Sequence, residues 1–340
     1  MRKILAVLFL AVGTGLTPFA QQDKHFSLFF ASPVYMNPAA AGFHEGQLRL
    51  YSNFRMQWMT ASDKPWMTTS AVADWRMFDR GAGFLGAGVQ FYNDMSGTGN
   101  YMVNTVSVPI NYAIQLAEDN HLSIGIQPAW YQRTIQSNAL TWDNQWNGAQ
   151  FDQSYASGEG FLNQNANVNK FDIGAGIYWH ANLSKSVRLS LGASGQHLTK
   201  QKINFYGADD KLFRKVTVHG QAEFRKKNSN VSVLPAFMAF VQGPNKSLVL
   251  GSNFKFHLRT ASLHTGYFDE ITYSVGMYYR TGDAILFNMI LEMAGFAIGA
   301  NYDLNVSSTT VATSGVGAME FFLRWKIRFG GRNLSNPRIH

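Results

Sequence analysis

The chain has 340 residues, a formal net charge of +8 and no cysteine. Without cysteine it has no disulfides, no thiol catalysis and no thiolate metal ligands. Its lysine and arginine residues are spread along the sequence, which argues against a nucleic-acid-binding surface. Charged residues make up 15% of the chain and aromatic residues 14%, a balance that suits a wall in contact with a membrane.

Residues 1–20 have the pattern of a signal peptide. Arg2 and Lys3 precede an apolar run from Ile4 to Val12, and a plausible cleavage site lies before Gln21. The apolar run is too short to span a membrane, which disfavours the alternative of an uncleaved anchor. No later stretch is long and apolar enough for a transmembrane helix, so we expect an exported protein of another kind.

Residues 21–46 form a polar, proline-containing segment ahead of the first expected strand. Pro33 favours an extended backbone around it, and Asn37-Pro38 is a turn-forming pair. We therefore expect an ordered coil here, as a separate plug-like segment.

From residue 47 to residue 329 the sequence alternates between apolar and polar side chains. In residues 171–183, the apolar side chains of Ile173 and Ile177 share one face, and Asp172 and His180 take the other. A strand sends successive side chains to opposite faces, so each segment has one apolar and one polar surface. In an exported protein this pattern predicts an all-β fold, a transmembrane antiparallel β-barrel of about 14 strands with lipid outside and a polar lumen. The expected strands are 47–58, 67–77, 84–94, 101–116, 121–133, 171–183, 186–198, 212–226, 230–241, 247–258, 271–281, 284–292, 295–304 and 316–329.

Two of these strands, 230–241 and 284–292, alternate poorly. In the second, Asn288 and Glu292 lie among apolar residues on both faces. Residues 330–340 are expected to form a short C-terminal tail.

An even number of strands places both termini in the periplasm, so residues 21–46 are expected at the periplasmic mouth. The connections then sort by length, except that 258–270 would be a long periplasmic turn. Short periplasmic turns are expected at 118–120, 183–185 and 226–228, and longer outer loops at 59–66, 134–170, 199–211 and 305–315.

The longest insertion, 134–170, is rich in asparagine and glutamine with aromatic residues among them. A loop of this length often has a function of its own. It is either a contact surface for a cargo protein or a plug, or else an unstructured external loop. The candidate contact residues are Trp142, Trp146, Phe151 and Tyr155.

No pattern for catalysis, metal binding or cofactor binding stands out. Gly81, Gly83 and Gly86 match the G-x-G-x-x-G dinucleotide pattern, but the chain continues as an alternating strand instead of the required helix. The histidines are dispersed without metal-ligand spacing, and no serine sits in a nucleophile motif. We therefore expect a non-enzymatic protein without a cofactor.

The polar faces of the first and last expected strands carry opposite charges. Arg49 and Arg55 lie on the first, Glu320 lies on the last, and Asp303 lies on the strand before it. Charges facing a lumen must be paired when they are buried. Because the first and last strands meet when a barrel closes, Arg49 or Arg55 should pair with Asp303 or Glu320. This pairing either closes the barrel or contacts a partner.

Motifs at both ends of the mature chain resemble the PorP/SprF family. The N-terminal match is Phe-Ser, then P-x-x-x-N-P-A, a glycine and R-x-Q-W, with Phe54 in place of the usual tyrosine. The C-terminal match is Y-D-x-N-x-S followed by G-x-x-E. The matching residues are Phe26, Ser27, Pro33, Asn37, Pro38, Ala39, Gly42, Arg49, Arg55, Gln57, Trp58, Tyr302, Asp303, Ser307, Gly317 and Glu320.

The resemblance implies an outer-membrane barrel of the type IX secretion system at the cell surface of a Gram-negative bacterium. Members of the family assist the export or surface attachment of particular cargo proteins, often gliding-associated adhesins with a C-terminal sorting domain. Expected partners are that cargo, other secretion components and outer-membrane lipids. The alternatives from the residues alone are a general porin or ligand channel and an adhesin scaffold. An open lumen would favour the porin, and a lumen filled by residues 21–46 or by the loop with Trp142 and Trp146 would favour the accessory role.

Overall fold

The computed structural model describes residues 23–62, 64–79, 81–97, 101–135, 140–158, 166–203, 211–259, 270–308 and 310–329. The expected signal peptide, 1–20, and the expected C-terminal tail, 330–340, lie outside these residues.

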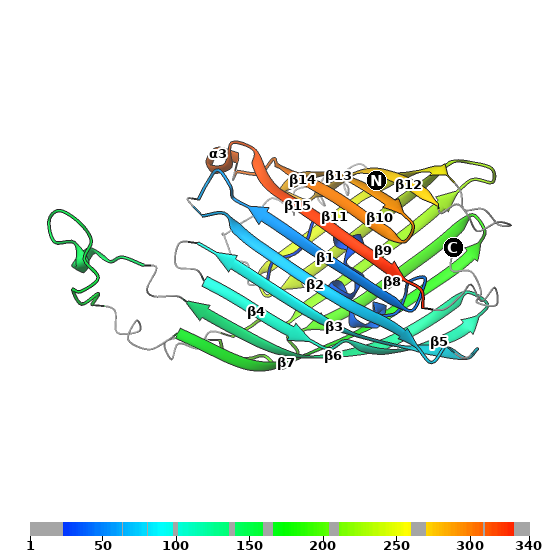
Figure 1. Ribbon diagram of the computed structural model, residues 1–340, viewed down its shortest axis with the longest axis horizontal. Helices are drawn as coiled ribbons and strands as arrows, with labels where there is room; N and C mark the ends of the chain where they lie inside the picture. Colours follow the sequence, from blue (N-terminus) through cyan, green and yellow to red (C-terminus); the bar gives the residue numbers. More distant parts are fainter. Residues whose placement is uncertain are drawn as a thin grey trace, which may run out of the picture.

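The fold is a single closed antiparallel sheet (Figure 1). Consecutive strands pair along the wall with one exception, and the first strand pairs with the last to close it. The strands are β1 (Leu48–Gln57), β2 (Trp66–Met77), β3 (Gly83–Ser96), β4 (Tyr101–Ser107), β5 (Ile110–Ala117), β6 (Asn120–Ile135), β7 (Ala166–Ser184), β8 (Val187–Gln196), β9 (Lys215–Arg225), β10 (Val231–Gln242), β11 (Asn245–Arg259), β12 (Ile271–Arg280), β13 (Ala284–Met293), β14 (Phe296–Asn305) and β15 (Val316–Ile327).

The fifteen strands occupy fourteen positions in the wall. Both β4 and β5 lie between β3 and β6, so together they form one position. The break falls at Val108 and Pro109, because proline has no N–H to donate to the sheet. The predicted barrel of about 14 strands is confirmed, and the single strand expected at 101–116 is divided by this proline.

The two faces of the wall differ as the alternation predicts. On β7, Phe171 is 58% exposed and Ile177 53%, whereas Asp172 between them is 5% exposed. Phe254 on β11 and Trp325 on β15 also face outward. The outer face is therefore apolar, as contact with lipid requires.

The connections differ between the two ends of the barrel. The longer ones join β6 to β7, β8 to β9 and β14 to β15, and we call this the long-loop end. The turns between β5 and β6, β7 and β8, and β13 and β14 are short, and we call this the short-turn end. The connection 258–270, which we expected to be an unusually long periplasmic turn, joins β11 to β12 at the short-turn end. Residues 260–269 lie outside the described chain.

Helical structure is limited to short turns in the described part of the chain. The loop connections carry η4 (Asp143–Gln145) and α3 (Thr310–Thr313). No helix there is long and apolar enough to cross a membrane.

Residues 23–46, which we call the lumen segment, lie inside the barrel, where Figure 1 shows them in dark blue. They form three helical turns, η1 (Phe29–Ala31), α2 (Pro33–Met36) and η2 (Pro38–Ala40). The segment enters from the long-loop end, where Asp23 contacts His197, and leaves at the short-turn end, where β1 begins. It differs from the expected coil at one mouth, because its apolar side chains have the inner wall to pack against.

Apolar side chains of the lumen segment pack in two clusters on the inner wall. Leu28 and Val34 meet Tyr51, Ile290 and Phe322, while Phe29 and Met36 pack against a second group from β10 to β13. This explains the two poorly alternating strands. On β10 and β13 the inward side chains are partly apolar because they cover the lumen segment instead of facing water. The second group comprises Ala236, Met238, Phe240, Val249, Tyr278, Ala284 and Leu286.

The position of Leu191 on the outer face yields a stability prediction. Leu191 is 46% exposed in the middle of β8, so arginine there would lie in the hydrocarbon region. Leu191→Arg should lower the free energy of unfolding by about 2–4 kcal/mol in lipid vesicles. Leu116→Arg, on an outward residue at the end of β5, should cost about 0–1 kcal/mol. Equal, small effects in urea titrations would contradict this orientation.

Candidate functional site

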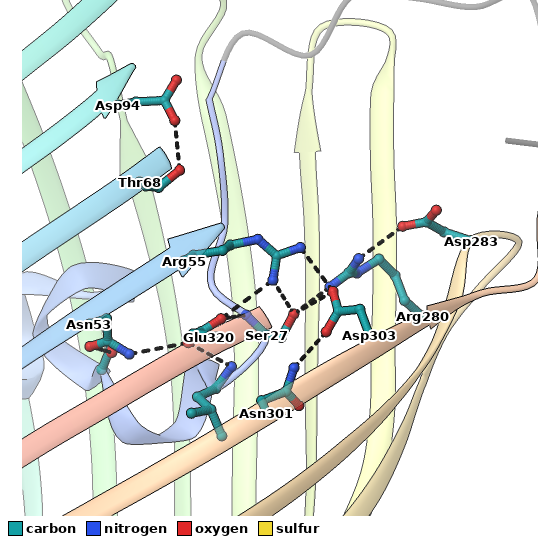
Figure 2. Close-up of polar contacts among 12 residues, drawn as sticks. Ser27, Asn53, Arg55, Thr68, Asp94, Arg280, Asp283, Asn301, Asp303 and Glu320 are labelled. Atoms are coloured by element: carbon teal, nitrogen blue, oxygen red, sulfur yellow. Dashed lines mark hydrogen bonds and ion pairs between the residues drawn. The ribbon is translucent and has the colours of Figure 1, made fainter. Parts of the chain in front are cut away.

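The side chain of Ser27 is the centre of a buried polar network between the lumen segment and the wall (Figure 2). Its hydroxyl donates to Asp303 Oδ2 at 2.8 Å and accepts from Arg280 Nη2 at 2.7 Å and from Arg55 Nη1. Arg55 and Arg280 each also contact Asp303 Oδ2, at 2.8 and 2.9 Å. One serine thereby connects the lumen segment to β1, β12 and β14.

Glu320 on β15 holds the backbone beside Ser27. Its carboxylate accepts from the Ser27 N–H at 2.7 Å and from the Leu28 N–H at 3.1 Å. It also accepts from Asn53 Nδ2 at 3.2 Å and lies 3.4 Å from Arg55 Nη1. Arg55 and Glu320 are directly opposite in the register that closes the barrel.

The sequence-based pairing of Arg55 with the acids is therefore present in the structure. Arg55 contacts both Asp303 and Glu320. Arg49 contacts neither of these acids: it makes two hydrogen bonds of 2.9 and 2.8 Å to Asp74 on β2. Asp74 in turn accepts the N–H of Gly42 at 2.8 Å.

His44 lies beside the pair of Arg49 and Asp74. Burial, with the nearby Arg49 guanidinium, lowers the pKa of His44 to about 4. The imidazole is therefore neutral at pH 7, and Asp74 is balanced by Arg49.

Asn37 and Pro38 fix the deepest turn of the lumen segment. Asn37 accepts the Ala39 N–H as an N-cap, and Pro38 occupies the first helical position. The Asn37 amide donates to the backbone oxygens of Ile177 at 2.8 Å and Ala193 at 3.3 Å. The asparagine therefore ties this turn to β7 and β8.

The inner wall approaches this turn closely because glycines line it. A Cβ on Gly176 would lie 2.1 Å from Asn37 Oδ1, and one on Gly125 would lie 2.7 Å from the Ala39 nitrogen. A Cβ on Gly86 would lie 2.2 Å from the Ala41 oxygen. Gly86 is the last glycine of the dinucleotide-like pattern, and it lies within β3 as the alternation predicts.

At the long-loop end, His197 joins the lumen segment to the wall. Its Nε2 lies 2.7 Å from Asp23 and its Nδ1 lies 2.6 Å from Asp172. Burial alone would lower the pKa of His197, but the two carboxylates raise it to about 9. Burial would raise the pKa of Asp23, but His197 and Lys215 hold it well below its usual range. The contact is thus an imidazolium between two carboxylates.

Other motif residues lie in the lumen segment or at the end of β1. Phe26 contacts Tyr35 edge-to-face at 5.1 Å between ring centroids, and Pro33 begins α2. Trp58 follows Gln57 at the end of β1 and stacks on Trp66 at 5.5 Å.

Three motif residues lie near the join of β14 and β15. A Cβ on Gly317 would lie 2.7 Å from the backbone oxygen of Asp303. The Ser307 oxygen accepts from Thr310 Oγ1, and Tyr302 lies opposite Met319.

The aromatic residues of the long loop are far from the lumen network. The described part of this loop, 140–158, contains a small folded unit that projects from the long-loop end (Figure 1). Trp146 forms a bridge with Phe151, and their ring centroids are 5.0 Å apart. Trp142 precedes η4, and Tyr155 is 53% exposed. The loop is an external unit, and the lumen is filled by residues 23–46.

Four site residues were not predicted from the sequence: Arg280, Asp74, Asp23 and His197. Arg280 and Asp74 are charged residues at inward positions of alternating strands, which was an available signal. Asp23 and His197 lie outside the strands, and no local pattern connects two residues so far apart in the chain.

Comparisons with known proteins agree with this architecture. The model of the family described as type IX secretion system membrane protein PorP/SprF matches residues 18–325. No curated protein matches the sequence. The toluene transporter TbuX of Ralstonia pickettii has a similar fold, with a TM-score of 0.51 and 11% identity over 88% of this chain and 94% of that one. A deletion mutant of the monoaromatic hydrocarbon channel TodX has a TM-score of 0.50 and 9% identity over 88% and 94%.

The closed wall, its apolar outer face and its filled polar lumen define an outer-membrane β-barrel protein. Within that class, the chain belongs to the PorP/SprF family of type IX secretion system membrane proteins. The likeness to the toluene transporter and to the hydrocarbon channel concerns the fold alone.

The Ser27 network yields a prediction about energetic coupling. Removing one partner of a buried ion pair leaves the other charge unpaired and costs about 3–5 kcal/mol. A double-mutant cycle on Arg55→Met and Asp303→Leu should therefore show less destabilisation than the sum of the single changes. The matched control is Arg49→Met with Asp303→Leu, which should be additive because Arg49 contacts Asp74. Additivity in both cycles would contradict the network.

The His197 contact yields a pH prediction. Its pKa of about 9 in the folded protein exceeds the value of about 6.5 in the unfolded chain. The stabilisation is therefore complete below about pH 6.5 and lost as the pH rises through about 9. The difference in unfolding free energy between wild type and His197→Gln should shrink from pH 6 to pH 10, by on the order of 3 kcal/mol at most.

Urea titrations across this pH range would measure the effect. Thr199→Val is the matched control, because it removes a hydrogen bond from an uncharged hydroxyl to the same Asp172. Its effect should not depend on pH. A constant effect of His197→Gln from pH 6 to pH 10 would rule out the charged contact.

Proposed function

We propose that this protein is a non-enzymatic accessory barrel that assists the export or surface attachment of particular type IX cargo proteins. The cargo is of the class that carries a C-terminal sorting domain, such as gliding-associated adhesins. Membership of the PorP/SprF family supports a place in this secretion system. The narrower role rests on the state of the lumen.

The filled lumen is the observation that favours an accessory over a porin. A general porin needs a continuous aqueous channel, and here residues 23–46 cross the barrel with most of their side chains buried. Leu28, Val34 and Asn37 are each 0% exposed. These residues leave no room for a solute path where they meet the wall, and a closed barrel suits holding or guiding a partner at its ends.

The folded unit of the long loop is the candidate surface for cargo. Trp146, Phe151 and Tyr155 are each about half exposed, although aromatic side chains of this size are usually buried. Their rings offer apolar area with little conformational entropy to lose on binding. Gln145 beneath them is buried and accepts the Trp142 N–H, which keeps the unit folded.

Deleting the gene should therefore affect particular surface proteins. We expect one or a few sorting-domain cargo proteins to disappear from the cell surface while other type IX cargo is secreted normally. Comparative surface proteomics of the deletion and parent strains measures this. A uniform collapse of type IX secretion would indicate a core component instead.

Conductance separates the accessory role from the porin alternative. The purified protein in planar lipid bilayers should show no large stable conductance, because the lumen segment closes the barrel. Persistent channels in the intact protein, with unchanged cargo and slower solute uptake in the deletion strain, would favour the porin.

A further inference from the structure

The lumen segment carries no charge along most of its length. Residues 26–43 contain no aspartate, glutamate, lysine, arginine or histidine, and charged side chains occur at its two ends. The wall around it is rich in buried charges, among them Arg49, Arg55, Asp303 and Glu320. An uncharged peptide therefore lies in a charged lumen.

The wall charges around Ser27 are balanced without the segment. Arg55 and Arg280 face Asp303 and Glu320, giving two positive and two negative groups on four different strands. Asp303 also accepts from Asn301, and Arg280 also contacts Asp283. These partners belong to the wall, so every charge keeps a partner if Ser27 leaves.

The contact between Gly42 and Asp74 is also made by an uncharged group of the segment. Asp74 is held by two hydrogen bonds from Arg49, and the segment adds the N–H of Gly42. From the segment side, Ser27 and Gly42 offer uncharged groups alone: two backbone N–H groups, and a hydroxyl that both donates and accepts. Leaving a buried charge unpaired is costly when two buried surfaces separate, and that cost is absent from both contacts.

The wall is also shaped to receive this particular backbone. Gly86, Gly125 and Gly176, on three different strands, would each overlap the segment if they carried a Cβ. Polar side chains of the wall bond the segment's backbone oxygens: Asn111 donates to Ala41 at 3.0 Å, and Gln196 donates to Tyr35 at 3.0 Å. A wall whose charges at the Ser27 and Gly42 contacts are balanced within the wall, and which is complementary to one peptide, has the features of a preformed binding site.

We propose that the inner wall is a receptor for a peptide whose central part is uncharged, and that residues 23–43 occupy it as an exchangeable ligand of the protein's own chain. Burial of Leu28, Phe29, Val34 and Met36 keeps the segment bound and the lumen closed. Withdrawal of the segment opens the lumen while the barrel stays folded. The ion pair between Asp23 and His197 holds the first residues of the segment at the long-loop end. This inference concerns the lumen and is independent of which cargo the barrel serves.

Cutting the folded full-length protein tests the proposal. A protease site inserted between Glu45 and Gly46 separates the segment from β1 after the barrel has folded in lipid. A fluorescent synthetic peptide of residues 23–43 is then added. We expect the peptide to bind the cut protein in exchange for the original segment, and the conductance of the washed, cut barrel to fall when the peptide is added.

Paired variants make the test specific. Gly176→Ala places a methyl group 2.1 Å from Asn37 Oδ1, whereas Gly174→Ala on the same strand meets atoms no nearer than 3.4 Å. The cut Gly176→Ala protein should bind the peptide at least tenfold more weakly, and the cut Gly174→Ala protein should bind like wild type. An Asn37→Ala peptide should bind the wild-type wall more weakly. No exchange after cutting, or equal binding by the two glycine variants, would overturn the proposal.

Thiol labelling provides a measurement on the uncut chain. The protein has no cysteine, so Ala31→Cys in the lumen segment gives a single thiol that is buried in the closed state. We expect a thiol reagent to label this cysteine in the folded barrel. Labelling should be faster when Ser27→Ala weakens the contact between the segment and the wall. Labelling that occurs only as the barrel unfolds in urea would show that the segment never leaves, and would overturn the proposal.

Discussion

The contact between Ser27 and the wall ties the lumen segment to the seam where β1 meets β15. Glu320 on β15 binds the backbone of Ser27 and Leu28, and it lies opposite Arg55 on β1. The same residues thus join the first strand to the last and hold the lumen segment against both. Because β1 and β15 are far apart in sequence, their pairing closes a very long loop, which costs entropy. Polar contacts made at this seam by a third element help to offset that cost.

Filling the lumen changes what the inner wall must be. An aqueous channel tolerates polar side chains, whereas a lumen occupied by a peptide needs apolar contacts, close backbone approach and paired charges at the same time. This wall supplies all three in different places. Apolar residues of β10 and β13 cover Phe29 and Met36, glycines of β3, β6 and β7 meet residues 37–41, and ion pairs surround Ser27. Each part of the wall thus matches the residues of the lumen segment that it contacts.

The first residues and the middle of the lumen segment are held by different kinds of contact. Its middle is bound by apolar packing and by hydrogen bonds of its own uncharged groups, several of them to charged side chains of the wall. Its first residues are bound through the charged contact of Asp23 with His197. The long-loop end also carries the folded unit with Trp146 and Phe151. The long-loop end therefore carries both the aromatic residues of the folded unit and the start of the lumen segment.

The sequence by itself determined the wall. Alternation with a period of two is a local property, so strands such as 247–258 and 316–329 were readable from their own side chains, and the opposite charges of Arg55 and Glu320 indicated a pair across the seam. The tertiary structure alone decided what lies inside. Nothing local distinguishes a peptide that packs in a lumen from one that lies at its mouth, since the outcome depends on glycines and apolar side chains contributed by many strands. The same reason explains why Arg49 pairs with Asp74 instead of Glu320: both acids are inward and charged, and their separation in space is fixed only when the sheet closes.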